Sequence, residues 1–381
     1  MALQAGIDGF DYTTLRVGPT TYTPGVAGAG PAVLLLHGFP QTHYCWQRIA
    51  PALAERHTVV VCDLKGYAGS PSAAGGPLGE GYSKREMAGE LVELMGELGF
   101  ERFSVVGHDR GGRVAYRMAL DHRDALERLA VLNIVPTVDQ FERMAADAAL
   151  DYWPFFLLAQ PAPFAERIVS ASAEYFVRHI LRSWPATPDA IAPEATERYV
   201  RAFTPDAISR ICAEYRAAFH IDRAMDADDH AAGRRIDCPV LVHWGAEEGS
   251  TSDGPLPVWR RWAAAVEAPR CRLATSSRRR RRRSWSPRCS ASFRRPHDRP
   301  RRHSRLVADA LLAALAIGHG VIGSRSERRC GGAPRPTWPA RCRRGRGRPG
   351  RSARRSPRAG RRSPRRRAGR GTSGSRRSGQ R

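Results

Sequence analysis

Short apolar runs alternate with helical patterns along the first two thirds of the chain. Residues 83–98 have the helical pattern, with Met87, Leu91 and Leu94 on one face and Ser83 placed to form a capping box with Glu86. Alternation of strand and helix predicts a doubly wound α/β sheet. The apolar runs, which have the length of buried parallel strands and end in turn residues, are 32–36, 58–62, 103–106, 129–132 and 240–243.

The alternation stops between residues 138 and 229, a stretch rich in Trp, Phe and Ala. Such a stretch between two strands predicts an inserted helical cap over the carboxyl ends of the strands, where α/β sheets bind ligands. The helix-forming segments in it are 151–168, 194–203 and 205–220. We therefore expect an α/β core in two parts, residues 1–137 and 230–272, on either side of a cap at 138–229.

The charge of the chain is distributed very unevenly. The formal net charge is +25, yet residues 273–381 hold 35 Arg, no Lys and three acids, a net charge of +32, which leaves −7 for the first 272 residues. A tail of this composition cannot bury enough apolar surface to fold, and we expect it to be disordered. A nucleic-acid-binding function would rest on the tail alone and would be non-specific and salt-sensitive.

The cysteines, the N-terminal sequence and one apolar segment at 306–323 narrow the class of protein further. The eight Cys residues include no C-x-x-C pair and no His/Cys cluster at zinc spacing, so we expect free thiols and no metal. The N-terminus lacks a basic start and an apolar run, which favours a cytoplasmic protein. Residues 306–323 are barely long enough for a membrane span and contain Asp309 and His319, so we expect none.

The candidate chemistry begins at Gly107-His108-Asp109-Arg110-Gly111, between the strand at 103–106 and a helical segment at 114–120. Glycines on both sides allow a tight turn that exposes the central side chain, here a carboxylate. A carboxylate is already ionised at neutral pH and can displace a leaving group from a saturated carbon, as in alkyl halides or epoxides. The resulting ester needs a base to activate water. The alternative is an ordinary surface turn containing Asp109.

Two neighbouring features favour an anionic substrate. His37-Gly38-Phe39-Pro40 follows the strand at 32–36, where the backbone N–H of Phe39 can face Asp109 and bind an oxyanion or a halide; the alternative is a plain turn. Arg110 and Arg113 lie three residues apart, so that both guanidinium groups can reach one cleft and hold a carboxylate. The alternative is a salt bridge to a neighbouring acid.

Seven segments together resemble one branch of a known family. They are HGFPQTHYCW (37–46), DLKGYAGS (63–70), YSKREMA (82–88), GHDRGGRVAYRMALDH (107–122), FLLAQPAP (156–163), EYRAA (214–218) and CPVLVHWGA (238–246). Over residues 10–266 the chain resembles the haloacetate/fluoroacetate dehalogenases of the α/β-hydrolase family. The resemblance implies that Asp109 is the nucleophile, that Arg110 and Arg113 hold the substrate carboxylate, and that Tyr215 stabilises the halide. It also implies a helical cap, a homodimer, and conversion of a haloacetate and water to glycolate and halide without a cofactor.

The resemblance fails at two groups of site residues. Asn133 stands where this branch has the acid that orients the catalytic His; an amide can hold the imidazole tautomer but cannot stabilise imidazolium by charge, so we expect activity to fall steeply. Glu247 or Glu248 could take its place. In the cap, Tyr152-Trp153-Pro154-Phe155 stands where fluoroacetate enzymes have Y-H-W. Trp153 remains a candidate substrate contact, but we expect poor defluorination and leave chloro- or bromoacetate open.

The G-H-F motif that supplies the family's base is also missing. Near residue 275 the chain instead reads Leu273 to Ser277 followed by six Arg. GC-rich codons chosen for Glu267 to Trp285 read GPPVPAGHFLPEEAPEEL from their third base, and residues 273–381 contain no Lys, Asn, Tyr or Met. We interpret the tail as translated in a shifted frame from near Glu267; a selected Arg-rich extension is the alternative. As written, the chain would alkylate Asp109 and stall.

Three competing functions remain open. An epoxide hydrolase also uses Asp attack but needs two cap tyrosines, of which only Tyr215 has a place, and the arginine pair favours an anionic substrate. A non-catalytic module for small carboxylates would bind ligand without releasing halide. An inactive pseudoenzyme with an Arg-rich nucleic-acid-binding tail would lose RNA binding on truncation at residue 272.

Overall fold

The computed structural model describes residues 6–142, 144, 149–150, 152–184, 191–244 and 254–268. Glu247, Glu248, the segment at 306–323 and the Arg-rich tail lie outside these residues. In the described part no helix is long and apolar enough to cross a membrane.

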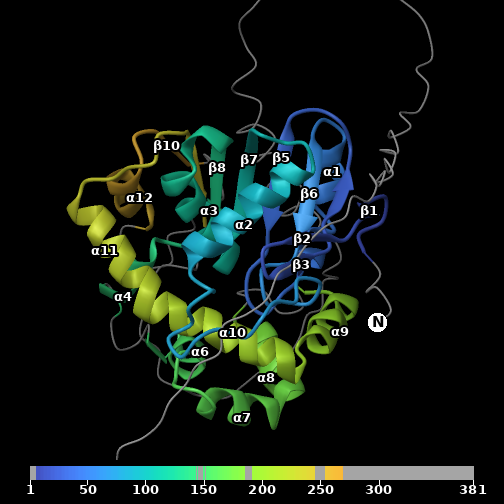
Figure 1. Ribbon diagram of the computed structural model, residues 1–381, viewed down its shortest axis with the longest axis vertical. Coiled ribbons are helices and arrows are strands. Elements are labelled where there is room, and N and C mark those ends of the chain that lie inside the picture. The colour runs from blue at the N-terminus through green and yellow to red at the C-terminus, as the bar shows by residue number, and fades with distance from the viewer. Residues whose placement is uncertain are drawn as a thin grey trace, which may run out of the picture. The chain divides into compact units, whose positions relative to one another are not determined.

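A mostly parallel sheet of eight strands forms the centre of the fold (Figure 1). Its order is β1-β4-β6-β5-β7-β8-β9-β10; β1 and β4 run antiparallel to their neighbours, and all strands from β6 to β10 are parallel. A separate hairpin pairs β2 with β3. The strands are β1 (Asp11–Tyr12), β2 (Leu15–Val17), β3 (Thr20–Tyr22), β4 (Gly25–Ala27), β5 (Ala32–Leu36), β6 (Thr58–Cys62), β7 (Phe103–His108), β8 (Leu126–Leu132), β9 (Val240–His243) and β10 (Val266–Glu267).

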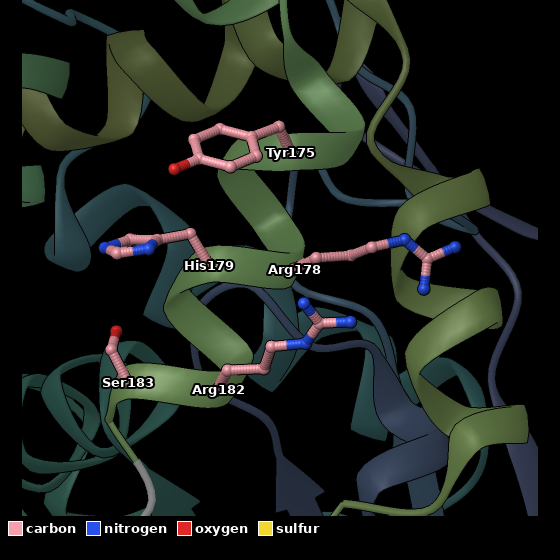
Figure 2. Close-up of a pocket in the computed structure, with 5 residues that line it drawn as sticks. All are labelled: Tyr175, Arg178, His179, Arg182 and Ser183. Atoms are coloured by element: carbon pink, nitrogen blue, oxygen red, sulfur yellow. The ribbon is translucent and has the colours of Figure 1, made fainter.

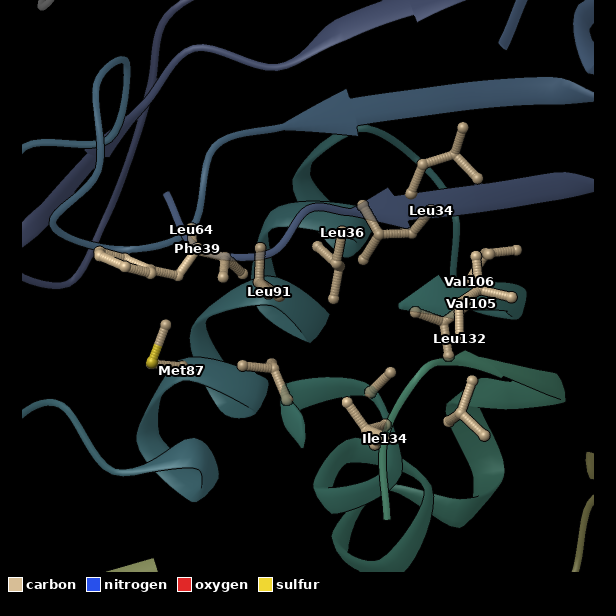
Figure 3. Packing of buried hydrophobic residues seen from close by; sticks show 14 of the residues in the cluster. Leu34, Leu36, Phe39, Leu64, Met87, Leu91, Val105, Val106, Leu132 and Ile134 are labelled. Carbon is tan, nitrogen blue, oxygen red and sulfur yellow. The ribbon is translucent and has the colours of Figure 1, made fainter. Parts of the chain in front are cut away.

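All five predicted strands are present, so the predicted α/β fold class is confirmed. β5, β6 and β9 have the predicted bounds, β7 ends two residues later, and β8 begins three residues earlier. Every residue of β5 is buried, which explains its continuous apolar sequence, since a central parallel strand is covered on both faces. Side chains of α2, among them Met87 and Leu91, point toward the strands and pack with residues such as Leu36 (Figure 3).

Helices cover the sheet and fill the segment between β8 and β9. Ser83 caps α2 as predicted: its Oγ accepts a 3.2 Å hydrogen bond from the Glu86 N–H, and Glu86 Oε2 accepts one of 3.1 Å from the Ser83 N–H. The helices are α1 (Ala50–Ala54), α2 (Lys84–Glu97), α3 (Arg110–Asp121), α4 (Thr137–Glu142), α6 (Trp153–Leu158), α7 (Phe164–Ser170), α8 (Ala173–Ser183), α9 (Pro193–Ala202), α10 (Pro205–Ala217), α11 (Arg223–Ala231) and α12 (Leu256–Trp262).

Between residues 138 and 229 all described secondary structure is helical, as predicted, but the helix-forming segment at 151–168 is not one helix. Pro161 and Pro163 separate α6 from α7, because proline lacks the N–H for the helical ladder and its ring clashes with the preceding turn. The predicted helix at 205–220 ends as α10 at Ala217 and continues through one π-helical turn, Ala218–Asp222, into α11. The bounds of the cap, 138–229, remain a prediction.

A buried network of charges ties α11 to α3. Arg117 pairs with Asp226 at 3.0 Å and with Asp229 at 2.5 Å. Asp226 Oδ2 also accepts hydrogen bonds from the Tyr116 hydroxyl at 2.5 Å and from the Thr137 N–H at 2.9 Å. These contacts fix the end of the inserted helices against the helix that begins beside Asp109.

Candidate active site

Asp109 lies at the sharp turn between β7 and α3, at the carboxyl end of the sheet. Its backbone has φ 48° and ψ −114°, a sparsely populated conformation for a residue other than glycine, and such strain concentrates at functional sites. The Gly111 N–H donates a 2.9 Å hydrogen bond to the His37 carbonyl oxygen. A Cβ atom on Gly107 would lie 2.5 Å from the Gly111 carbonyl oxygen, and one on Gly111 would lie 2.5 Å from that of His37. The predicted need for glycine at both positions is thus confirmed.

The loop after β5 brings a backbone donor to Asp109. The Phe39 N–H donates a 2.9 Å hydrogen bond to Asp109 Oδ1, so these two predicted site residues do meet. His37 braces the loop, because its Nε2 accepts a 3.0 Å hydrogen bond from the Leu64 N–H. Within the described residues Asp109 Oδ2 accepts no hydrogen bond, which leaves it free to react.

The buried carboxylate of Asp63 holds the same loop through hydrogen bonds. One carboxylate oxygen, Oδ1, accepts a 2.6 Å hydrogen bond from the His43 N–H and lies 3.0 Å from His43 Nδ1, while Oδ2 accepts a 2.8 Å bond from the Gly69 N–H. Burial alone would raise the pKa of Asp63, but His43 outweighs it and holds that pKa well below the ordinary value. The carboxylate therefore stays ionised and ties His43 to Gly69.

Arg110 begins α3 and is almost fully buried. Its Nε donates to both carboxylate oxygens of Glu214, at 2.9 and 3.0 Å, and its Nη2 donates to Glu214 Oε1 at 2.5 Å. The salt bridge to a neighbouring acid, which the sequence left open, is therefore present. Within the described residues Nη1 is buried without a hydrogen-bond partner. Nη1 is thus the nitrogen that remains for a substrate, and a carboxylate cannot pair with the Nε and Nη2 edge unless the Glu214 contact breaks.

Arg113 has a different environment, although it is also buried, with 3% of its surface exposed. Its Nη1 donates to the Val135 carbonyl oxygen at 3.1 Å and to Thr137 Oγ1 at 3.2 Å, and its Nε has no partner. No carboxylate of the described residues forms an ion pair with it. A buried cation without a counter-charge is costly, so this position is suited to an anionic ligand.

Aromatic side chains from the inserted helices close over Arg110. The ring of Tyr215, in α10, lies 4.1 Å from the guanidinium carbon, and that of Phe155, in α6, lies 5.2 Å from it. Tyr215 also packs edge-on against Phe39, with ring centroids 5.4 Å apart. Trp153 lies elsewhere, against Phe176 with ring centroids 5.6 Å apart. Among the predicted substrate contacts, Tyr215 and Phe39 therefore come together, and Trp153 packs among aromatic rings of the inserted helices.

Sequence reasoning missed three residues near Asp109. Glu214 and Lys84 form an ion pair beside Arg110, and Glu214 is fully buried. The Tyr67 hydroxyl is buried without a partner, and its ring stands edge-on to His37 at 5.0 Å. Burial raises the pKa of Tyr67 well above the ordinary value, and the nearby Glu214, Tyr215 and Asp109 groups raise it further against the effect of Arg110. The phenol is therefore a neutral donor. All three lie in segments that the sequence analysis quotes, namely DLKGYAGS for Tyr67, YSKREMA for Lys84 and EYRAA for Glu214, but these side chains were given no role.

Asn133 follows β8 directly and has φ 56°, a left-handed conformation that Asn adopts more readily than most residues. Its N–H donates a 2.9 Å hydrogen bond to the His243 carbonyl oxygen at the end of β9. Asn133 therefore lies beside the carboxyl end of β9, and Glu247 and Glu248 follow that strand in the sequence.

The family follows from comparison with known proteins. The model of the α/β-hydrolase fold family matches residues 31–268. This chain belongs to the α/β-hydrolase family. Among curated proteins, the hydrolase is 46% identical to a fluoroacetate dehalogenase of Burkholderia sp. over 63% of this chain and 79% of that protein. It is 32% identical to a soluble epoxide hydrolase of Corynebacterium sp. (strain C12) over 63% of this chain and 82% of that protein.

Solved structures agree with this assignment. The α/β hydrolase described here is similar to one from Nostoc sp. PCC 7120, with a TM-score of 0.66 and 41% identity over 69% of this chain and 90% of that one. It is also similar to a mutant of a provisionally assigned epoxide hydrolase from Pseudomonas aeruginosa with bound MFA, with a TM-score of 0.70 and 39% identity over 82% and 98% of the two chains. The resemblance to haloacetate dehalogenases predicted over residues 10–266 is confirmed over a segment of the chain, since 241 of its residues align with the fluoroacetate dehalogenase.

Two further observations concern other parts of this α/β hydrolase. A surface hollow runs along α8, lined by Tyr175, Arg178, His179, Arg182 and Ser183 (Figure 2). It includes none of the residues around Asp109. Within the described residues no three His, Cys, Asp or Glu side chains are grouped as metal ligands.

Proposed function

We propose that this hydrolase acts on 2-haloacids such as haloacetates, with Asp109 as the nucleophile. The observation that carries the proposal is the buried Arg113 guanidinium, which has no carboxylate partner among the described residues. A small carboxylate would supply the missing counter-charge and could accept a second hydrogen bond from the free Nη1 of Arg110. The 46% identity to a fluoroacetate dehalogenase supports the same substrate class.

The first chemical step follows from the two unequal oxygens of Asp109. Phe39 holds Oδ1, so Oδ2 attacks the α-carbon; the carbon–halogen bond breaks, and halide leaves with the bonding electrons. The product is a carboxymethyl ester of Asp109. Tyr215, which lies over Arg110 and beside Phe39, is the donor we assign to the departing halide.

The second step would use the same backbone donor. Water adds to the ester carbon, negative charge develops on Oδ1, and the Phe39 N–H already points at that oxygen. The water must lose a proton to a base, and the sequence lacks the G-H-F motif that supplies it in this branch. Asn133 lies at the position of the orienting acid, with Glu247 and Glu248 as alternatives. We infer that the chain as written forms the ester and stalls, and that a frame shift near Glu267 removed the base.

Epoxide hydrolysis is the second candidate. The 32% identity to a soluble epoxide hydrolase supports it, as do two phenols near Asp109, Tyr215 and Tyr67, which could donate to a ring oxygen. A neutral epoxide would leave Arg113 without a counter-charge, which is why the haloacid is preferred. The cytoplasmic location expected from the sequence remains a prediction, and the homodimer remains a prediction of the resemblance.

Substrate charge separates these candidates in one experiment. The protein is incubated with chloroacetate, with its neutral isostere chloroacetamide, or with a small epoxide, and the peptide containing Asp109 is analysed by mass spectrometry. We expect carboxymethylation of Asp109 by chloroacetate and little labelling of that residue by the amide, with Asp109→Asn as the control for reaction elsewhere. Labelling by the epoxide alone would support the second candidate, and labelling by neither would refute both.

A further inference from the structure

Glu214 determines how Arg110 can meet a ligand. The carboxylate is fully buried and grips the Nε and Nη2 edge of the guanidinium through three hydrogen bonds of 2.5 to 3.0 Å. The rings of Tyr215 and Phe155 lie 4.1 and 5.2 Å from the same guanidinium. The side chain is therefore held on one edge and packed by aromatic rings, and Nη1 is its one nitrogen that has no hydrogen-bond partner in the described part of the chain.

The charges around Glu214 balance. Lys84 forms an ion pair with Glu214 and lies 3.4 Å from Asp222, and both Lys84 and Asp222 are buried. Two cations thus face two carboxylates in this cluster, so Arg110 contributes little net charge to the site. Burial alone would raise the pKa of Glu214, but Arg110 and Lys84 hold it below the ordinary value, so the carboxylate stays ionised.

We propose that Glu214 is a positioning residue that makes the two arginines unequal: Arg113 supplies the charge that attracts the substrate carboxylate, and Arg110 supplies one fixed hydrogen-bond donor. The proposal rests on the haloacid function proposed above and adds what sets the orientation of its substrate. A substrate held at a fixed donor presents its α-carbon to Asp109 in one orientation, and orientation rather than affinity is what Glu214 provides.

Glu214→Gln tests this, with Glu166→Gln as the matched control. Glu166 pairs with Arg216 at 2.8 Å in the inserted helices, so both variants weaken a largely buried Glu–Arg pair, but only the first involves Arg110. Two quantities are measured for each: the Kd of the unreactive anion acetate by calorimetry, and the rate of Asp109 alkylation at saturating bromoacetate by mass spectrometry.

For Glu214→Gln we expect acetate to bind no more weakly than to the wild type, because a negative charge has been removed near the anion site. The saturating alkylation rate should fall about tenfold or more, since the donor is no longer fixed. Glu166→Gln should change neither quantity. Glu214→Asp, which keeps the charge but shortens the side chain, should bind acetate like the wild type and recover part of the rate.

An unchanged alkylation rate in Glu214→Gln would overturn the proposal. A parallel loss of acetate binding and rate would also overturn it, because that is the result of a purely structural role. If Glu214→Gln does not fold, the rate and Kd of Glu214→Asp decide by the same criteria. If the wild type neither binds acetate nor is alkylated at Asp109, the haloacid function itself fails and the role of Glu214 fails with it.

Discussion

The backbone N–H of Phe39 donates a 2.9 Å hydrogen bond to Oδ1 of Asp109. Two loops at the same end of the sheet, one after β5 and one after β7, are joined by this bond. It divides the carboxylate into an oxygen that is held and an oxygen that can attack. Attack by Oδ2 and stabilisation of negative charge on Oδ1 by the Phe39 N–H both depend on this difference between the two oxygens.

Gly38→Ala should displace the Asp109 carboxylate relative to the Phe39 N–H that holds its Oδ1. A Cβ atom on Gly38 would lie 2.6 Å from Asp109 Cβ and 2.9 Å from Asp109 Oδ1, so the loop or the carboxylate must move. We expect the rate of Asp109 alkylation by chloroacetate to fall at least about tenfold, because the hydrogen bond that positions Oδ2 for attack is displaced and small displacements of reacting groups cost that much or more. Gly96→Ala, at an open position in α2, is the control and should only stabilise the protein, by about 0.5–1 kcal/mol. Equal rates in the two variants would contradict the assignment.

Two of the three buried arginines of α3, Arg113 and Arg117, should differ in their response to replacement by methionine. Arg117→Met leaves the buried Asp226 without the cation that pairs with it, and Asp229 with Arg234 alone, and should destabilise the protein by about 3–5 kcal/mol in urea unfolding. Arg113→Met removes an unpaired buried charge together with two hydrogen bonds, and its stability should stay within about 1 kcal/mol of the wild type. The same variant should no longer bind acetate. A large destabilisation by Arg113→Met would show that Arg113 has a structural counter-charge.

The stability of the fold should depend on the protonation of Asp226. Burial raises the pKa of Asp226 to about 6, against the effect of Arg117 and of the Tyr116 hydrogen bond. The folded state then binds a proton that the unfolded state has already lost, so this contribution is present at pH 4 and disappears as the pH rises through 6. It amounts to about 2–3 kcal/mol between pH 4 and pH 7.

Urea unfolding of the wild type and of Asp226→Asn at several pH values isolates this contribution, because the other titrating groups are common to both proteins. We expect the wild type to lose stability relative to the variant as the pH rises from 4 to 7. A difference that does not change with pH would refute the raised pKa.

The interpretation of the tail as translated in a shifted frame is tested on the DNA. Resequencing the gene over the codons for residues 255–290 should reveal one base whose correction restores a G-H-F motif near position 275. The corrected protein should release halide over many turnovers. A confirmed reading frame would mean that the Arg-rich tail belongs to the protein and that the base is missing by nature.

The fold could be predicted where local patterns were strong. β5 and β6 have their predicted bounds because strands buried on both faces are continuously apolar. The strands from β1 to β4 and β10 have only two or three residues each, and several of these residues are partly exposed, so no periodic pattern marks them. The break between α6 and α7 could have been found from Pro161 and Pro163.

The site was predictable where its residues follow directly after predicted strands. Asp109 and Phe39 were identified because each follows a predicted strand, and neighbouring parallel strands end at the same edge of the sheet. The pairing of Arg110 with Glu214 joins residues 104 positions apart, and no local pattern reveals such a contact. For that reason the sequence left the roles of Arg110 and Arg113 equal, whereas the structure separates them.

The most direct test of the account is the stoichiometry of halide release from chloroacetate. The chain as written should release one halide per polypeptide, stop, and carry a carboxymethyl ester on Asp109; Asp109→Asn should release none by this route. Steady release over many turnovers would contradict the stalled intermediate. Release without modification of Asp109 would contradict its role as the nucleophile.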